Sequence, residues 1–110
     1  MKNFIQEGDA LTVAAPYALT PGQGVQVGHI FGIAFGAAAQ GAAVEISREG
    51  VFTLTAAAAD TATQGALAYW DDAARDITTV ATNNLLVGAF TAAKSAGVAF
   101  ADVLVDGVVR

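Results

Sequence analysis

The clearest pattern along the chain is an alternation of bulky and small side chains between positions 25 and 35. The bulky positions are Val25, Val27, His29, Phe31, Ile33 and Phe35. A period of two residues is that of a β-strand, so this segment predicts one strand, or two strands joined at a glycine, with a bulky face and a bare face. We expect the bare face to let another backbone or subunit approach closely. The phase of His29 predicts a partly buried strand histidine.

Short apolar segments separated by turn residues continue the pattern on both sides of this region. Strands are expected over residues 11–15, 42–47, 51–55, 67–70, 77–81 and 85–90, with one or two more over 98–109. The residues at 48–50 predict a hairpin between the strands that flank them. Asn83 and Asn84 are expected to turn a second hairpin, because asparagine tolerates the left-handed backbone region.

The alanine-rich stretch 56–64 is too short and too polar for a stable helix, so it predicts a loop or a single helical turn. About eight short strands at spacings of about ten residues predict an all-β fold, a single small β-sandwich or barrel. A chain of 110 residues allows one domain. We expect residues 1–6 to form an N-terminal arm and residues 7–110 to form the β domain.

Charge and composition exclude several classes of function. Ten acidic residues against five basic ones give a net charge of −5, so nucleic acid is not an expected partner. The absence of cysteine and the single histidine exclude disulfides, thiolate chemistry and paired-imidazole metal sites. The longest apolar run, residues 30–39, is about half the length that spans a membrane, so no membrane association is expected. We expect no enzyme, no cofactor and no small-molecule substrate.

Residues 88–95 come nearest to a nucleotide-binding motif. They match a phosphate-binding loop at Gly88, Lys94 and Ser95, but Ala93 stands where the second glycine is required. A Cβ at that position obstructs the wrapping of backbone amides around phosphates, and the strand pattern continues where the motif requires a helix. A polar loop after a strand is therefore the better interpretation.

Three acids near position 71 raise the question of a calcium site. Asp71, Asp72 and Asp76 lack the glycine and glutamate spacing of the regular twelve-residue calcium loop. A solvated turn is the better interpretation, and no metal is expected there.

Two groups of side chains are candidates for contacts with a partner or another subunit. Tyr69 and Trp70 lie at the end of an expected strand, where such rings anchor an interface if exposed and a core if buried. The other group is the arm, whose apolar side chains pack either on the chain's own domain or on a neighbour. Its candidate residues are Lys2, Asn3, Phe4 and Ile5. The apolar fraction of 55% is rich in alanine, which predicts a thin core and favours self-association.

Several segments, in this order, resemble the phage and prophage capsid cement family, also called head-decoration proteins. The resemblance rests on residues 3–9, 27–34, 49–52, 64–71 and 86–88, and it extends from Asn3 to about Val105. Members were formerly catalogued as a domain of unknown function and sometimes labelled predicted recombinases. The chain departs from the family pattern in alanine-rich stretches near positions 37 and 56 and at residues 106–110.

The resemblance implies a β-rich homotrimer that binds the major capsid protein on the outer surface of an expanded phage head and stabilises it. Two alternatives stay open. One is a nucleic-acid-acting, recombinase-like phage protein, which the acidic charge and the broken phosphate loop do not support. The other is a carbohydrate- or receptor-binding module displayed on the particle, for which an exposed Trp70 or Tyr17 would be the first sign.

Overall fold

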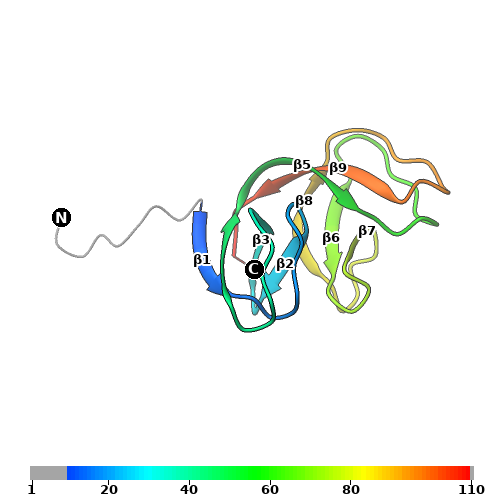
Figure 1. Cartoon of the computed structure of the whole chain (residues 1–110). Coiled ribbons are helices and arrows are strands. Elements are labelled where there is room, and N and C mark those ends of the chain that lie inside the picture. The colour runs from blue at the N-terminus through cyan, green and yellow to red at the C-terminus, as the bar shows by residue number, and fades with distance from the viewer. Residues whose placement is uncertain (1–9, 110) are drawn as a thin grey trace, which may run out of the picture.

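The computed structural model describes residues 10–109, and these residues form nine strands and no helix (Figure 1). The strands are β1 (Ala10–Ala14), β2 (Gly24–Val27), β3 (Ile30–Ala34), β4 (Ala43–Ser47), β5 (Glu49–Thr55), β6 (Leu67–Asp71), β7 (Asp76–Thr78), β8 (Leu85–Phe90) and β9 (Phe100–Asp106). The prediction of an all-β fold is confirmed. Residues 56–64, where the sequence also allows a helical turn, form a loop with isolated bridges.

The first four strands form an antiparallel sheet in the order β1-β4-β3-β2, here called the small sheet. Apolar side chains from its strands and from the segment between β1 and β2 pack together on one side of it. They are Ala15, Tyr17, Leu19, Val25, Ala34, Val44 and Ile46. This cluster is the smaller of two cores.

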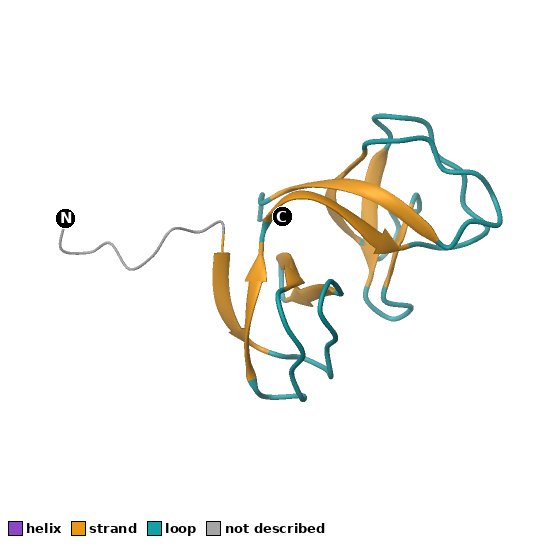
Figure 2. Cartoon of the chain, turned by 45° about the horizontal axis from the view of Figure 1, so that its top comes forward, coloured by secondary structure: helices purple, strands orange, loops and turns teal. Residues whose placement is uncertain are grey.

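The remaining strands form a five-stranded antiparallel sheet in the order β5-β9-β8-β6-β7, here called the large sheet. Ala56, just beyond β5, forms a parallel bridge with Ile77 of β7, so the two edges of the sheet come together. The curvature that this closure requires is visible in the long bent strands of Figure 2. The concave side encloses the larger core, which includes Leu54, Ala68, Trp70, Ile77, Val87, Phe90, Ala101, Val103 and Val105.

A tight turn at Gly28 and His29 divides the predicted alternating segment into β2 and β3. Val27 lies directly opposite Ile30, so the loop has only these two residues. Gly28 has φ 61°, and a positive φ at the first loop position is typical of the turns that fit the twist of a hairpin. His29 is therefore an exposed turn residue, and the prediction of a partly buried strand histidine is wrong.

This turn also inverts the phase of the alternation. Opposite residues of an antiparallel pair point to the same side, and Val25 lies opposite Gly32. Phe31 and Ile33 therefore point to the other side, where they join the larger core, while Val25 joins the smaller core. The prediction of a single bulky face is wrong. The β2–β3 hairpin instead has apolar side chains on both faces and links the two cores.

The small residues of this segment allow close approach within the chain itself. A Cβ added at Gly32 would lie 2.8 Å from the carbonyl oxygen of Ser47, and one added at Gly24 would lie 2.7 Å from the ring of Trp70. Of the two possibilities that the bare face leaves open, the close approach at Gly32 is that of another backbone of the same chain, and the space beside Gly24 and Gly32 is not available to another subunit.

The expected hairpin at residues 48–50 is not formed. β4 and β5 belong to different sheets, and β5 pairs along its whole length with β9, from Glu49 opposite Asp106 to Thr55 opposite Phe100. The chain passes from the small sheet to the large sheet at Arg48, whose guanidinium donates a hydrogen bond to the carbonyl oxygen of Gly107. Residues 48–50 are thus a crossing between sheets.

The second expected hairpin is correct in its turn and wrong in its pairing. Asn83 has φ 63°, in the left-handed region that the asparagine pair predicts. However, β7 and β8 do not pair with each other, because both pair with β6, which lies between them.

Candidate functional site

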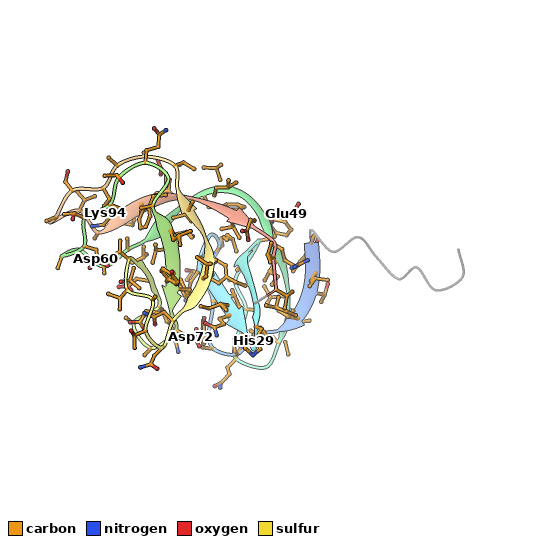
Figure 3. All side chains as sticks on the ribbon, turned by 180° about the vertical axis from the view of Figure 1, so that it is seen from behind. His29, Glu49, Asp60, Asp72 and Lys94 are labelled. Carbon is orange, nitrogen blue, oxygen red and sulfur yellow. The ribbon has the colours of Figure 1, made fainter. Side chains whose placement is uncertain are left out.

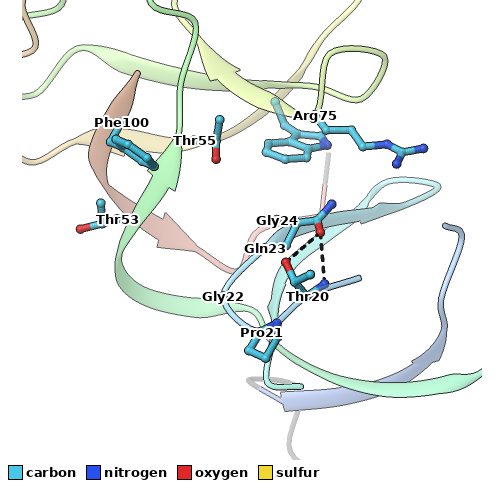
Figure 4. Close-up of a pocket in the computed structure, with 10 residues that line it drawn as sticks. Thr20, Pro21, Gly22, Gln23, Gly24, Thr53, Thr55, Arg75 and Phe100 are labelled. Atoms are coloured by element: carbon cyan, nitrogen blue, oxygen red, sulfur yellow. Dashed lines mark hydrogen bonds between the residues drawn. The ribbon is translucent and has the colours of Figure 1, made fainter. Parts of the chain in front are cut away.

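An open cleft of about 400 Å³ lies where the turn before β2 faces the large sheet (Figure 4). Its side chains are mainly small or polar, and Arg75 is the one charged residue among them. The lining residues are Thr20, Pro21, Gly22, Gln23, Gly24, Thr53, Thr55, Trp70, Arg75 and Phe100. The lining offers threonine hydroxyls but no carboxylate, imidazole or thiol that could act as a general base to activate them.

Beside this cleft, one carboxylate joins the two sheets. Asp72 accepts a hydrogen bond of 2.9 Å from the hydroxyl of Tyr17 and one of 3.0 Å from Nε1 of Trp70. Burial and the hydrogen bond to Asp72 raise the pKa of Tyr17 to about 12. The guanidinium of Arg75 lies 3.7 Å above the Tyr17 ring, a cation–π contact. These groups are engaged with one another and stabilise the junction between the sheets.

Trp70 belongs to the core. Its side chain is 1% exposed, and its ring lies 5.2 Å from that of Phe31, which reaches across from the small sheet. Of the two roles that the sequence leaves open for this ring, the structure places it in the core rather than on a surface available to a partner. Tyr17 is also buried, so neither ring gives the exposed aromatic platform that would indicate a carbohydrate-binding module.

Lys94, the lysine of the apparent phosphate-binding loop, is buried and bound by the chain itself. Its Nζ donates hydrogen bonds to the carbonyl oxygens of Asp60 at 2.7 Å, Ser95 at 3.3 Å and Ala58 at 3.4 Å. Figure 3 shows Lys94 and Asp60 together at one end of the molecule. The residues after β8 form a loop, as the sequence indicates. The Lys94 side chain therefore links the loop after β8 to the loop after β5 by hydrogen bonds.

Asp60 extends this loop junction to β7. Its carboxylate accepts a hydrogen bond of 2.6 Å from the hydroxyl of Thr78 and one of 3.0 Å from the backbone amide of Thr79. These two donors, with a smaller contribution from the charge of Lys94, lower the pKa of Asp60. The carboxylate is thus held ionised in a structural role.

The acids near position 71 lie at a turn between two strands: Asp71 ends β6, Asp72 lies in the turn and Asp76 begins β7. Asp71 accepts hydrogen bonds from the amides of Ala73 at 3.0 Å and Ala74 at 3.2 Å, the pattern of an Asx turn. Burial, together with the charges of Asp71 and Asp60, raises the pKa of Asp76. Among residues 10–109, no group of three or more potential ligand side chains is placed to hold a metal ion. The same residues include no helix that could cross a membrane.

The convex side of β5, β9, β8 and β6, here called the outer face, carries large apolar side chains that are exposed, and within the described strands such side chains occur in the large sheet alone. Val51 is 61% exposed, Leu67 is 55% exposed and Leu104 is 45% exposed, although all three lie within strands. Tyr69 is partly buried and shares this side with Leu67, because alternate residues of β6 point the same way while Ala68 and Trp70 point into the core. The structure therefore separates the two neighbouring rings that the sequence groups together.

The other predicted contact residues, Lys2, Asn3, Phe4 and Ile5, lie outside the residues that the structure describes, and their role stays a prediction. Sequence reasoning missed Val51, Leu67 and Leu104. A signal for Leu104 exists in β9, where apolar residues occupy both phases of the alternation: Ala101, Val103 and Val105 are buried, whereas Phe100 and Leu104 are exposed. A strand with one solvated face normally carries polar residues in the exposed phase.

These features are those of a small all-β structural protein, with charged groups that fasten its own loops and an apolar sheet surface turned outward. The chain belongs to the phage cement protein family, whose model matches residues 5–106. The resemblance seen in the sequence is thereby confirmed, and membership assigns the chain a capsid cement role on the virion. No curated protein and no solved structure gives a significant match to the chain.

Proposed function

We propose that this protein binds the major capsid protein on the outer surface of the expanded phage head and stabilises the shell without catalysing a reaction. The observation that carries the proposal is the family match over residues 5–106, which includes every strand of the fold. The hydrogen bonds of Lys94 and Asp60, which hold the loops in place, and the closed large sheet suit this role, because a protein that stabilises a shell must itself be rigid.

We further propose that the protein acts as a homotrimer on the head. Three copies that bind together gain from multivalency, so weak contacts of each copy add up to durable attachment. The glycines of β2 and β3 do not support this proposal, since they face the chain's own residues. Its support is the small size of the two cores and the exposed apolar side chains that lie outside the strands of the large sheet, such as Phe35 and Val98, which leave area to bury between molecules.

Co-sedimentation with purified heads tests the proposed function. Expanded heads that lack endogenous cement are mixed with the protein, and we expect saturable retention in the pellet together with a higher temperature of head disruption. Unexpanded heads are the control and should retain less protein. Recovery of all the protein in the supernatant above expanded heads would contradict the proposal.

A further inference from the structure

An uninterrupted apolar row crosses four strands on the outer face. Val51 of β5 lies opposite Leu104 of β9, Leu104 lies opposite Ala89 of β8, and Ala89 lies opposite Leu67 of β6. Residues that face each other across antiparallel strands point to the same side, so these four side chains form one continuous line. At a strand spacing of about 4.8 Å, the row is about 14 Å long.

The large apolar side chains of this row are exposed although they lie within the strands of a sheet. Its three large side chains are each at least 45% exposed, whereas their neighbours along the strands, such as Val103 and Val105, are fully buried. The apolar side chains of the concave side already fill the core, so the outward ones are not required for it. A row of this length on an otherwise acidic protein is typical of a surface that another molecule covers.

Acidic residues border the row on both sides along β5 and β9. The neighbouring pair in one direction is Glu49 opposite Asp106, and in the other direction it is Thr53 opposite Asp102. The Thr53 hydroxyl donates a 2.6 Å hydrogen bond to Asp102, which fixes that carboxylate at the border. No outward position of β5, β6, β8 or β9 carries a lysine or arginine. The outer face is therefore apolar in its middle and negative at its border.

We propose that the outer face is the surface that binds the capsid, and that the capsid-protein surface it covers is apolar in its centre and carries lysine or arginine side chains around it. Charge complementarity favours this occupant over a second copy of the chain, because the chain has ten acidic and only five basic residues. Two outer faces packed together would in addition bring Asp102 and Glu49 toward acids of the same kind. This inference rests on the proposed function and adds to it the surface and the chemistry of the partner.

The inference is tested by the affinity for expanded heads of two variants with a substitution in the row, compared with a matched control variant. Val51→Lys and Leu104→Lys each place a charge in the row, and we expect each to weaken binding to expanded heads at least tenfold. Val80→Lys is the control, since Val80 is 51% exposed and lies in the loop after β7. The affinity of this variant for heads should be within twofold of that of the native protein. Circular dichroism and thermal melting check that all three variants fold like the native protein.

The charge of the border has a separate test. Asp102→Asn removes one charge and keeps an oxygen that can accept the hydrogen bond from Thr53, so the fold should be unaffected. We expect the affinity of this variant for heads to depend less steeply on salt than that of the native protein, because it has one ion pair fewer to screen. An unchanged salt dependence would contradict the basic partner surface.

The outcomes separate this inference from the proposed function. If the native protein does not bind heads, the proposed function fails. If the native protein binds and Val51→Lys and Leu104→Lys bind equally well, the function stands and the outer face is not the capsid-binding surface. If these variants lose self-association by light scattering but keep their affinity for heads, the outer face joins copies of the chain, and the inference is overturned.

Discussion

The hydroxyl of Tyr17 donates a hydrogen bond to Asp72 across 55 positions of sequence, at 2.9 Å. Tyr17 belongs to the smaller core and Asp72 follows β6 of the large sheet, so this bond links the two halves of the fold. The same carboxylate oxygen accepts from Nε1 of Trp70, which holds the buried indole in place. A single exposed acid thus satisfies two donors from largely buried rings.

The first prediction concerns this acid. Asp72→Ala removes the acceptor from both donors, and we expect the free energy of unfolding to fall by about 2 kcal/mol, because unsatisfied polar groups in partly buried positions are costly. Asp72→Asn keeps an acceptor oxygen and should lose less than half of that amount. Urea denaturation followed by tryptophan fluorescence measures both values, and equal stability of the native protein and Asp72→Ala would contradict the assigned role.

Tyr17 predicts a loss of stability in alkaline solution. Its pKa is raised from 10.0 to about 12 in the folded protein, so the unfolded chain loses this proton at lower pH than the folded one. The stabilisation is complete below pH 10 and is lost as the pH rises toward 12. Denaturation curves across this range measure the effect, and Tyr17→Phe is the control that should show a weaker pH dependence. A native protein whose stability follows that of Tyr17→Phe over the whole range would refute this.

Lys94 is predicted to contribute to stability rather than to nucleotide binding. Lys94→Met keeps much of the side-chain volume but removes the three hydrogen bonds that Nζ donates. The carbonyl oxygens of Ala58 and Ser95 keep backbone donors, so the main loss is at the carbonyl oxygen of Asp60, and we expect a loss of about 1–3 kcal/mol. Ser95→Ala, at the exposed neighbouring position, is the control and should stay within about 0.5 kcal/mol of the native protein. Thermal denaturation measures the difference. Magnesium-dependent ATP turnover that disappears in Lys94→Met would show that the structural role is not the whole of its function.

The alternation of residues 25–35 shows how far the sequence predicts the fold. It correctly indicates strands on both sides of Gly28, because a period of two depends only on the backbone. It does not reveal that the turn has two residues, and that detail decides which side Phe31 and Ile33 face. The faces of a hairpin depend on the register across its turn, which local periodicity does not contain.

The strand partners and the residues of the outer face could not be predicted from the sequence for the same reason, because both depend on contacts between distant segments of the chain. Sequence neighbours such as β4 and β5 look like a hairpin, yet β5 pairs with β9, which lies about 50 positions further along the chain. The closure of the large sheet determines which phase of β9 is buried, and only then does Leu104 become identifiable as a surface residue. Tyr69 and Trp70 likewise separate only when the inside of the sheet is known.

The N-terminal arm carries a prediction from the sequence alone. Phe4 and Ile5 precede the described residues, and burial of both against the capsid would contribute roughly 3–5 kcal/mol before the cost of ordering the segment. We expect deletion of residues 2–5 to leave the melting temperature nearly unchanged and to weaken head binding, which co-sedimentation measures. Full affinity of the shortened protein for heads would refute this role, and unfolding would show that these residues belong to the protein's own core.

Gly88 provides the sharpest test of the pairing between β8 and β9. A Cβ added at Gly88 would lie 1.7 Å from the carbonyl oxygen of Leu104, so the two backbones can approach as they do only if this residue has no side chain. Gly88→Ala must push β9 away or distort β8, and we expect a loss of about 3 kcal/mol or more in the free energy of unfolding. Gly36→Ala is the matched control, because nothing lies within 4 Å of an added Cβ there and its backbone is not in the left-handed region. That variant should be within about 0.5 kcal/mol of the native protein in the same urea titration. Equal stability of the two alanine variants would mean that β8 and β9 are not paired in this register.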